Sequence, residues 1–126
     1  MIALVSFASL ARADGPAKDV VPKGKGWFCT EWYTPDHAAD SLGMCQRTAK
    51  DCEALRSEKK KNAPSQVVTE CTKQPNAAVF TFHNKMKDNW QFAATPQSKQ
   101  CELFRGFIAR DADNDQISDC AAVGDL

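Results

Sequence analysis

Two pairs of cysteines with the same spacing place the strongest constraint on how this chain folds. The chain has 126 residues and six cysteines. Cys52 and Cys71 are 19 positions apart, and so are Cys101 and Cys120. The flanking residues match as well, since CEALR (52–56) aligns with CELFR (101–105) and VTEC (68–71) with ISDC (117–120). The pattern indicates one unit used twice, with repeats of about 27–75 and 77–122.

The repeat also predicts how the cysteines pair, a choice that six cysteines alone leave open among 15 possibilities. When residues 27–30 are placed opposite 79–82, the second copy lacks both Cys29 and Cys45, whose counterparts are about Thr81 and one of residues 92–94. Loss of both together is expected of bonded partners, because loss of one would leave a free thiol. We therefore predict three disulfides: Cys29–Cys45, Cys52–Cys71 and Cys101–Cys120.

An apolar run at the N-terminus indicates export. Residues 2–10 are uncharged and mostly apolar, and residues 11–13 (ARA) have the small-x-small pattern of a signal peptidase site. The run is too short to span a bilayer, which takes about 20 residues. We predict a signal peptide over residues 1–13 and a secreted or periplasmic protein, where disulfides persist. Residues 14–26, rich in Gly, Pro and Lys, predict a flexible lead-in, and residues 27–126 a single domain.

The charge balance limits the classes of partner. The 16 basic side chains are matched by 16 acidic ones, whereas proteins that bind nucleic acids or anionic membranes usually carry a basic excess. We expect no nucleic-acid partner and no membrane span. The expected partner is an unidentified protein or envelope component, and no cofactor is expected.

The first repeat predicts two strands, a helix and a further strand. Residues 26–33 are aromatic and β-favouring, and residues 42–46 suit a hairpin partner that places Cys29 opposite Cys45. Thr48 is a good N-cap for a helix to about residue 61, because a carboxylate follows in its first turn and lysines in its last. Residues 66–72 predict the next strand.

The second repeat predicts the same order of elements, with strands over residues 77–84, 90–94 and 116–122. The helix is expected to begin with Thr95 as N-cap and Pro96 as its first residue, and to run to about Arg110. Apolar residues at intervals of three and four predict a broad buried stripe, although Gly106 weakens the helix. The residues of this stripe are Cys101, Leu103, Phe104, Phe107 and Ile108.

These elements predict an α+β fold class. We expect two fused strand-strand-helix-strand repeats that share a core. The sheet is expected to be mainly antiparallel, with two helices on one face and the three disulfides bracing it.

The acidic run over residues 111–115 is the nearest approach to a metal site. Asp111, Asp113 and Asp115 alternate as carboxylates do in the first half of a calcium-binding loop. The rest of the loop does not follow, because Gln116 stands where the turn needs glycine and Ala122 where the loop needs glutamate. We retain the three carboxylates as a weak calcium candidate and expect a solvated polar turn; no two cysteines have the spacing of a zinc site.

Groups that could carry catalysis are few. The chain has two histidines, His37 and His83, each expected in or beside a loop. The cysteines are expected to be bonded, and no phosphate-binding loop or hydrolase signature is present. We therefore expect surface roles for both histidines and assign no catalytic residue.

Aromatic side chains offer a possible binding face. Trp27, Trp32, Tyr33 and Trp90 are of the types enriched at binding hot spots. Strand alternation puts Trp27 and Tyr33 on one face and Trp32 on the other, and both faces cannot line the same core. One aromatic set is then available for binding, unless the lead-in segment covers it.

A spaced motif in the first repeat consists of Trp27-Phe28-Cys29, then Cys45-Gln46-Arg47-Thr48, Cys52-Glu53 and Arg56. It resembles a loose set of secreted bacterial proteins with disulfide-stapled repeats. The resemblance covers roughly residues 26–121, and the second repeat departs from the motif by lacking the first cysteine pair. It implies an architecture and carries no known activity.

Two hypotheses of function follow from the sequence. The first is an exported, non-catalytic module that binds a protein or envelope component through a sheet face or a loop. The second is a small secreted hydrolase or inhibitor whose active groups lie on loops, near His37 or His83.

Overall fold

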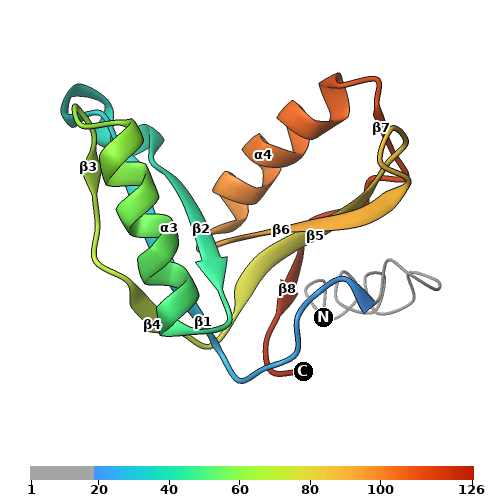
Figure 1. The fold of residues 1–126 in the computed structure, drawn as a ribbon, viewed down its shortest axis with the longest axis horizontal. Coiled ribbons are helices and arrows are strands. Elements are labelled where there is room, and N and C mark those ends of the chain that lie inside the picture. Colours follow the sequence, from blue (N-terminus) through green and yellow to red (C-terminus); the bar gives the residue numbers. More distant parts are fainter. Residues whose placement is uncertain (1–18) are drawn as a thin grey trace.

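The computed structural model describes residues 19–126. The predicted signal peptide and residues 14–18 of the predicted lead-in lie outside the described residues. The described chain forms two successive groups of elements in the same order (Figure 1). The first group comprises β1 (Trp27–Tyr33), the 3-10 segment η1 (Pro35–Asp40), β2 (Leu42–Gln46), α3 (Ala49–Asn62), β3 (Val67–Val68) and β4 (Thr72–Gln74). The second comprises β5 (Ala77–Asn84), β6 (Asn89–Thr95), α4 (Ser98–Arg110), β7 (Asn114–Asp115) and β8 (Ala121–Val123).

The predicted α+β fold class is confirmed, with antiparallel pairing throughout both groups. The strands form two four-stranded sheets rather than one, because β1 and β5 each pair with the other strands of their own half. The sheets meet where β2 contacts β6. A Cβ atom at Gly43 in β2 would lie 2.8 Å from the ring of Pro96, directly after β6. Proline has no N–H to donate, so Pro96 adds no backbone hydrogen bond at this junction.

Each sheet carries its own helix (Figure 1), α3 beside β1 and β2, and α4 beside β5 and β6. Two disulfides fix these helices at corresponding places. Cys52–Cys71 and Cys101–Cys120 each link a helix to the chain just before β4 or β8, with a Cα–Cα distance of 6.2 Å in both. Cys29–Cys45 joins two directly paired residues of β1 and β2. All three predicted disulfides are present, and neither helix of residues 19–126 is long and apolar enough to span a bilayer.

The helix starts agree with the sequence in one half and differ in the other. Thr48 caps α3 as predicted, with its hydroxyl accepting from the Asp51 N–H at 3.1 Å. In α4, however, the N-cap is Gln97, not Thr95. Thr95 is the last residue of β6, and its hydroxyl donates to the Gln97 carbonyl at 2.9 Å. The Gln97 N–H is satisfied instead by Oε1 of Gln100 at 3.1 Å, so α4 begins two residues later than predicted.

The last predicted strand of each half is mostly irregular, because residues 66–72 contain only β3 and the first residue of β4, and residues 116–122 contain only the first two residues of β8, with β7 just before them. A hydroxyl replaces the ladder at the break: Thr69 Oγ1 accepts from Glu31 N, and Ser118 Oγ accepts from Thr81 N, both at 2.9 Å. An arginine of the helix then binds the carbonyl of the same residue. Arg56 Nε donates to Thr69 O at 3.0 Å, and Arg105 Nε donates to Ser118 O at 2.6 Å.

The two halves share a core, and the pairing of their strands corrects the predicted alignment of β1 with β5. Cys29 pairs with Thr72 in β4, and Val79 pairs with Ala121 in β8. Thr72 and Ala121 each follow the last cysteine of their half, so Val79, not Thr81, corresponds to Cys29. Its partner across β6 is Ala94. A shift of two residues keeps every side chain on the same face of a strand, which is why the sequence pattern did not expose the error.

A buried arginine ties the ends of the described chain to the first sheet. Arg47 is 9% exposed, and its guanidinium carbon lies 3.7 Å from the centre of the Trp27 ring. Its nitrogens donate to the carbonyls of Pro22 at 2.8 Å, Gly26 at 2.7 Å and Gly124 at 2.9 Å. Burial lowers the pKa of Arg47 from its ordinary value, and Asp125 partly opposes that shift; a guanidinium still keeps its proton.

The described part of the predicted lead-in is therefore not a free tether. Val21 is buried in the shared core, and the backbones of Gly24 and Leu126 exchange two hydrogen bonds of 3.2 and 2.9 Å. The composition suggested flexibility, but residues 19–26 are held because the carbonyls of this segment satisfy a buried cation.

We predict that Arg47→Ala lowers the free energy of unfolding by about 3 kcal/mol or more, because buried carbonyls lose their donor. The exposed Lys23→Ala is the matched control, with an expected change within about 0.5 kcal/mol. Urea unfolding followed by tryptophan fluorescence measures both. Equal stability of the two variants would contradict the structural role of Arg47.

We also predict that the double variant Cys29→Val, Cys45→Ala folds, because Val79 and Ala94 already fill the corresponding buried positions of the other half. Loss of the cross-link alone costs about 3 kcal/mol for a loop of this size. Cys52→Ala with Cys71→Ala is expected to cost more, since Cys52 is fully buried and its truncation adds a cavity. Denaturant midpoints of the two double variants rank them, and the reverse order would refute the prediction.

Candidate functional site

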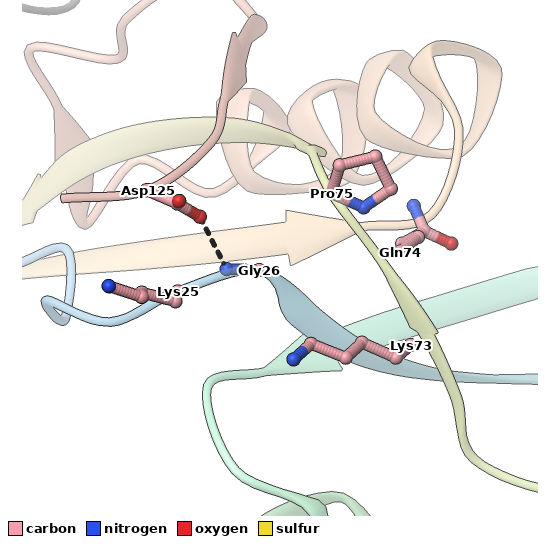
Figure 2. A pocket seen from close by; sticks show the side chains of 6 residues that line it. All are labelled: Lys25, Gly26, Lys73, Gln74, Pro75 and Asp125. Carbon is pink, nitrogen blue, oxygen red and sulfur yellow. Dashed lines mark hydrogen bonds between the residues drawn. The ribbon is translucent and has the colours of Figure 1, made fainter.

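An open cavity lies where the start of β1, the end of β4 and the C-terminal segment meet (Figure 2). It has a volume of about 420 Å³ and is lined by Lys25, Gly26, Lys73, Gln74, Pro75 and Asp125. One carboxylate oxygen of Asp125 accepts from the Gly26 N–H at 2.7 Å, and both lysines are exposed. The lining offers two ammonium groups and a carboxylate but no histidine, hydroxyl or thiol, so it does not contain the hydroxyl–histidine or thiol–histidine pair of a typical nucleophilic site.

A histidine beside carboxylates lies elsewhere, at the far end of β5. His83 Nδ1 is 2.9 Å from Asp115 in β7, and Nε2 is 3.0 Å from Asp88 in the β5–β6 turn. The Trp90 ring centre is 5.2 Å from that of the imidazole. The hydrogen bond to Asp115 chiefly, and that to Asp88, raise the pKa of His83 above its ordinary value. Because carboxylates flank both ring nitrogens, this arrangement stabilises an imidazolium and braces the turn.

The three carboxylates of the calcium candidate do not converge. Asp111 accepts from the backbone N–H of Asp113 at 2.9 Å, while Asp115 is engaged by His83. Within residues 19–126 no three histidine, cysteine or carboxylate side chains are placed to hold a metal ion. The run is a polar turn whose carboxylates serve the local backbone and His83.

The four aromatic residues of the predicted binding face are not brought together. Trp27 is fully buried between the halves, with Nε1 donating to Val123 O at 2.8 Å. Trp32 is 5% exposed, and the Lys59 ammonium of α3 lies 4.4 Å from its ring centre. Tyr33 and Trp90 are half-buried, in different sheets. Both faces of β1 are covered because the sheet has a different neighbour on each side, the second half and α3. His37 is exposed in η1.

Two of the five exposed large apolar residues among residues 19–126 share one face of α4, whereas Val67, Met86 and Leu126 lie singly elsewhere. Leu103 is 43% exposed and Phe107 45%, whereas the sequence placed both in the buried stripe. Cys101 is fully buried, and Phe104 and Ile108 pack on the core of the second sheet, so this part of the prediction is correct. The predicted buried stripe was too wide because only a narrow face of α4 packs against the second sheet.

Gly106 lies beside Leu103 and Phe107 on α4. A Cβ atom at this position would meet nothing within 4 Å. A glycine inside a helix costs about 0.5–1 kcal/mol relative to alanine, and the packing of the chain supplies no reason for it. The outer face of α4, which we define as Leu103, Gly106, Phe107 and Arg110, follows the spacing of three and four that aligns side chains along a helix.

The first half provides an internal comparison for this face. The disulfides align Cys52 with Cys101, so the positions of Leu103 and Phe107 are those of Ala54 and Glu58 in α3. The fold therefore tolerates a small residue and a charged one at these positions. The alignment of the two cysteine pairs contains this contrast, and it is the signal in the sequence that would have identified the face.

No protein-family model, curated protein or solved structure matches this chain. A functional site is therefore assigned from the geometry of the chain itself.

We predict that the His83 contribution to stability depends on pH. Because the folded protein raises the pKa of His83 above about 6.5, the contribution is fully present below that pH. It is lost as pH rises through the higher pKa of the folded state. Unfolding free energies of the wild type and His83→Gln should differ most near pH 6 and converge in alkaline solution. His37→Gln is the control, and a difference that grows with pH would contradict the sign.

Proposed function

We propose that this protein is an exported, non-catalytic interaction module that binds a protein partner through the outer face of α4. The observation that carries the proposal is the pair of exposed apolar residues on α4, at positions where the corresponding helix carries Ala54 and Glu58. Exposed apolar side chains that gather on one face are typical of protein–protein contacts. Phenylalanine and arginine, both on this face, are enriched at such interfaces.

Export is part of the proposal. The three disulfides favour an oxidising compartment, and the predicted signal peptide over residues 1–13 gives a route to it. The two sequence repeats and the resemblance to secreted proteins with disulfide-stapled repeats agree with this location. A periplasmic or extracellular partner, such as an envelope protein, would meet the outer face of α4 there.

A hydrolase with loop-borne groups is the alternative, and His83 with Asp115 is the observation that favours it. A general base needs a free ring nitrogen directed at the substrate. Here Nε2, the nitrogen that would accept a proton from the substrate or from water, lies 3.0 Å from Asp88. The cavity lined by Lys25 and Lys73 contains no histidine. The groups for catalysis and the cavity for a substrate are thus in different places, and binding is the better supported function.

The test compares capture of partner proteins by the exported, oxidised chain and by a variant of α4. In Leu103→Ala with Phe107→Glu, α4 takes the residues that α3 carries at those positions, so the helix is expected to fold. We expect this variant to lose proteins that the wild type captures from the envelope or culture medium, identified by mass spectrometry.

The matched control is Ala54→Ser with Glu58→Gln in α3, which should leave capture unchanged. Intact-mass measurement without free thiols checks that both variants are folded and oxidised. Capture that is equal for the wild type and the α4 variant would refute the proposed function.

A further inference from the structure

We infer that the outer face of α4 binds the same face of a second copy of this chain, with the two helices antiparallel and Gly106 at the two-fold axis. The inference rests on the proposed interaction function and names its partner. A contact of a surface with itself is the usual arrangement in homodimers, because one patch then serves both subunits.

Gly106 is the point of closest approach. It adjoins Leu103 on the side away from Phe107, and its missing side chain leaves the backbone of α4 accessible. Two helices that cross at glycines can approach more closely than helices that cross at larger residues. Leu103 and Phe107 then lie on one side of the crossing point on each copy, and each is exposed enough to contact the other helix.

The charges of α4 suit an antiparallel copy. In a pair centred on Gly106, a residue four positions before the glycine faces one four positions after it. Glu102 of one copy therefore faces Arg110 of the other. Opposite charges thus meet on both sides of the axis.

These charges are not already used within the described chain. In α3, Glu53 forms an ion pair with Arg56 at 3.5 Å. In α4, the corresponding Arg105 contacts Asp119 at 3.6 Å instead. Among residues 19–126 no ion pair involves Glu102, Lys99 or Arg110; the Arg110 guanidinium lies 5.5 Å from the Phe107 ring centre. The two halves differ here in one respect, because Glu53 is paired within its own helix and Glu102 is left for a partner.

The size of the face predicts a weak dimer. A helix of 13 residues is about 20 Å long, so an α4–α4 contact buries less than the roughly 1,200 Å² of a standard interface. We expect half-association at roughly 100 μM. Such a dimer forms where the protein is concentrated.

Sedimentation velocity of the exported, oxidised protein from about 1 to about 500 μM tests the inference. The wild type is expected to shift from monomer to dimer across this range. Gly106→Gln should raise the dissociation constant at least about tenfold, because its side chain fills the crossing point. The same variant should keep or raise the urea midpoint of the monomer, since nothing in the chain contacts that position. Ser57→Gln, at the corresponding exposed position of α3, should change neither.

Charge reversal identifies the second copy and its orientation. Glu102→Arg and Arg110→Glu should each weaken the dimer, and the variant with both changes should restore it. A wild type that stays monomeric at every concentration would overturn the inference, as would a dimer that Gly106→Gln or the single reversals leave unchanged. The proposed function is judged separately, by whether Leu103→Ala with Phe107→Glu loses the proteins that the wild type captures, native copies of this chain included, whatever the sedimentation result.

Discussion

The contact between Arg47 and Trp27 holds the structure together at the place where its parts meet. The guanidinium lies over the indole, and it binds carbonyls from the segment before β1 and from the segment after β8. Trp27 in turn donates to the Val123 carbonyl. A buried cation requires several acceptors to compensate its lost hydration, so both segments are fixed against the first sheet. The burial of Val21 in the shared core and the position of Lys25, Gly26 and Asp125 in the lining of the cavity follow from this arrangement.

The two halves have the same scaffold but differ in the side chains that stabilise it. In each, a helix is bonded to its sheet through a disulfide, and an arginine of the helix binds the backbone where the last strand breaks. The first half adds a cross-strand disulfide where the second has Val79 and Ala94. At the position of Arg47 the second half has Pro96, which packs against Gly43 and closes the junction. Gln100 completes that junction, because its amide caps α4 through Oε1 and donates to Glu31 at 2.6 Å.

Much of the fold could be predicted from the sequence, and the errors have identifiable physical causes. Thr48 was a correct N-cap because a hydroxyl before a helix satisfies a backbone N–H locally. Thr95 was not, since its hydroxyl donates to the Gln97 carbonyl and the Gln97 N–H is satisfied by Gln100. The proposed binding face could be predicted only in part. Leu103 and Phe107 recur at helical spacing, and this periodicity identifies apolar positions without revealing how much of the helix the sheet covers.

The sequence by itself determined the covalent pairing of the cysteines and the order of the elements in each half. These depend on spacing, turn residues and local hydrogen bonding, which are encoded within short stretches of chain. Only the tertiary structure decided that Trp27 and Trp32 are buried on opposite faces of β1, and that the outer face of α4 remains open. Exposure is set by what packs against a residue from distant parts of the chain. For β1 those parts are the second half and α3, whereas no described part of the chain covers Leu103 and Phe107 on their outer side.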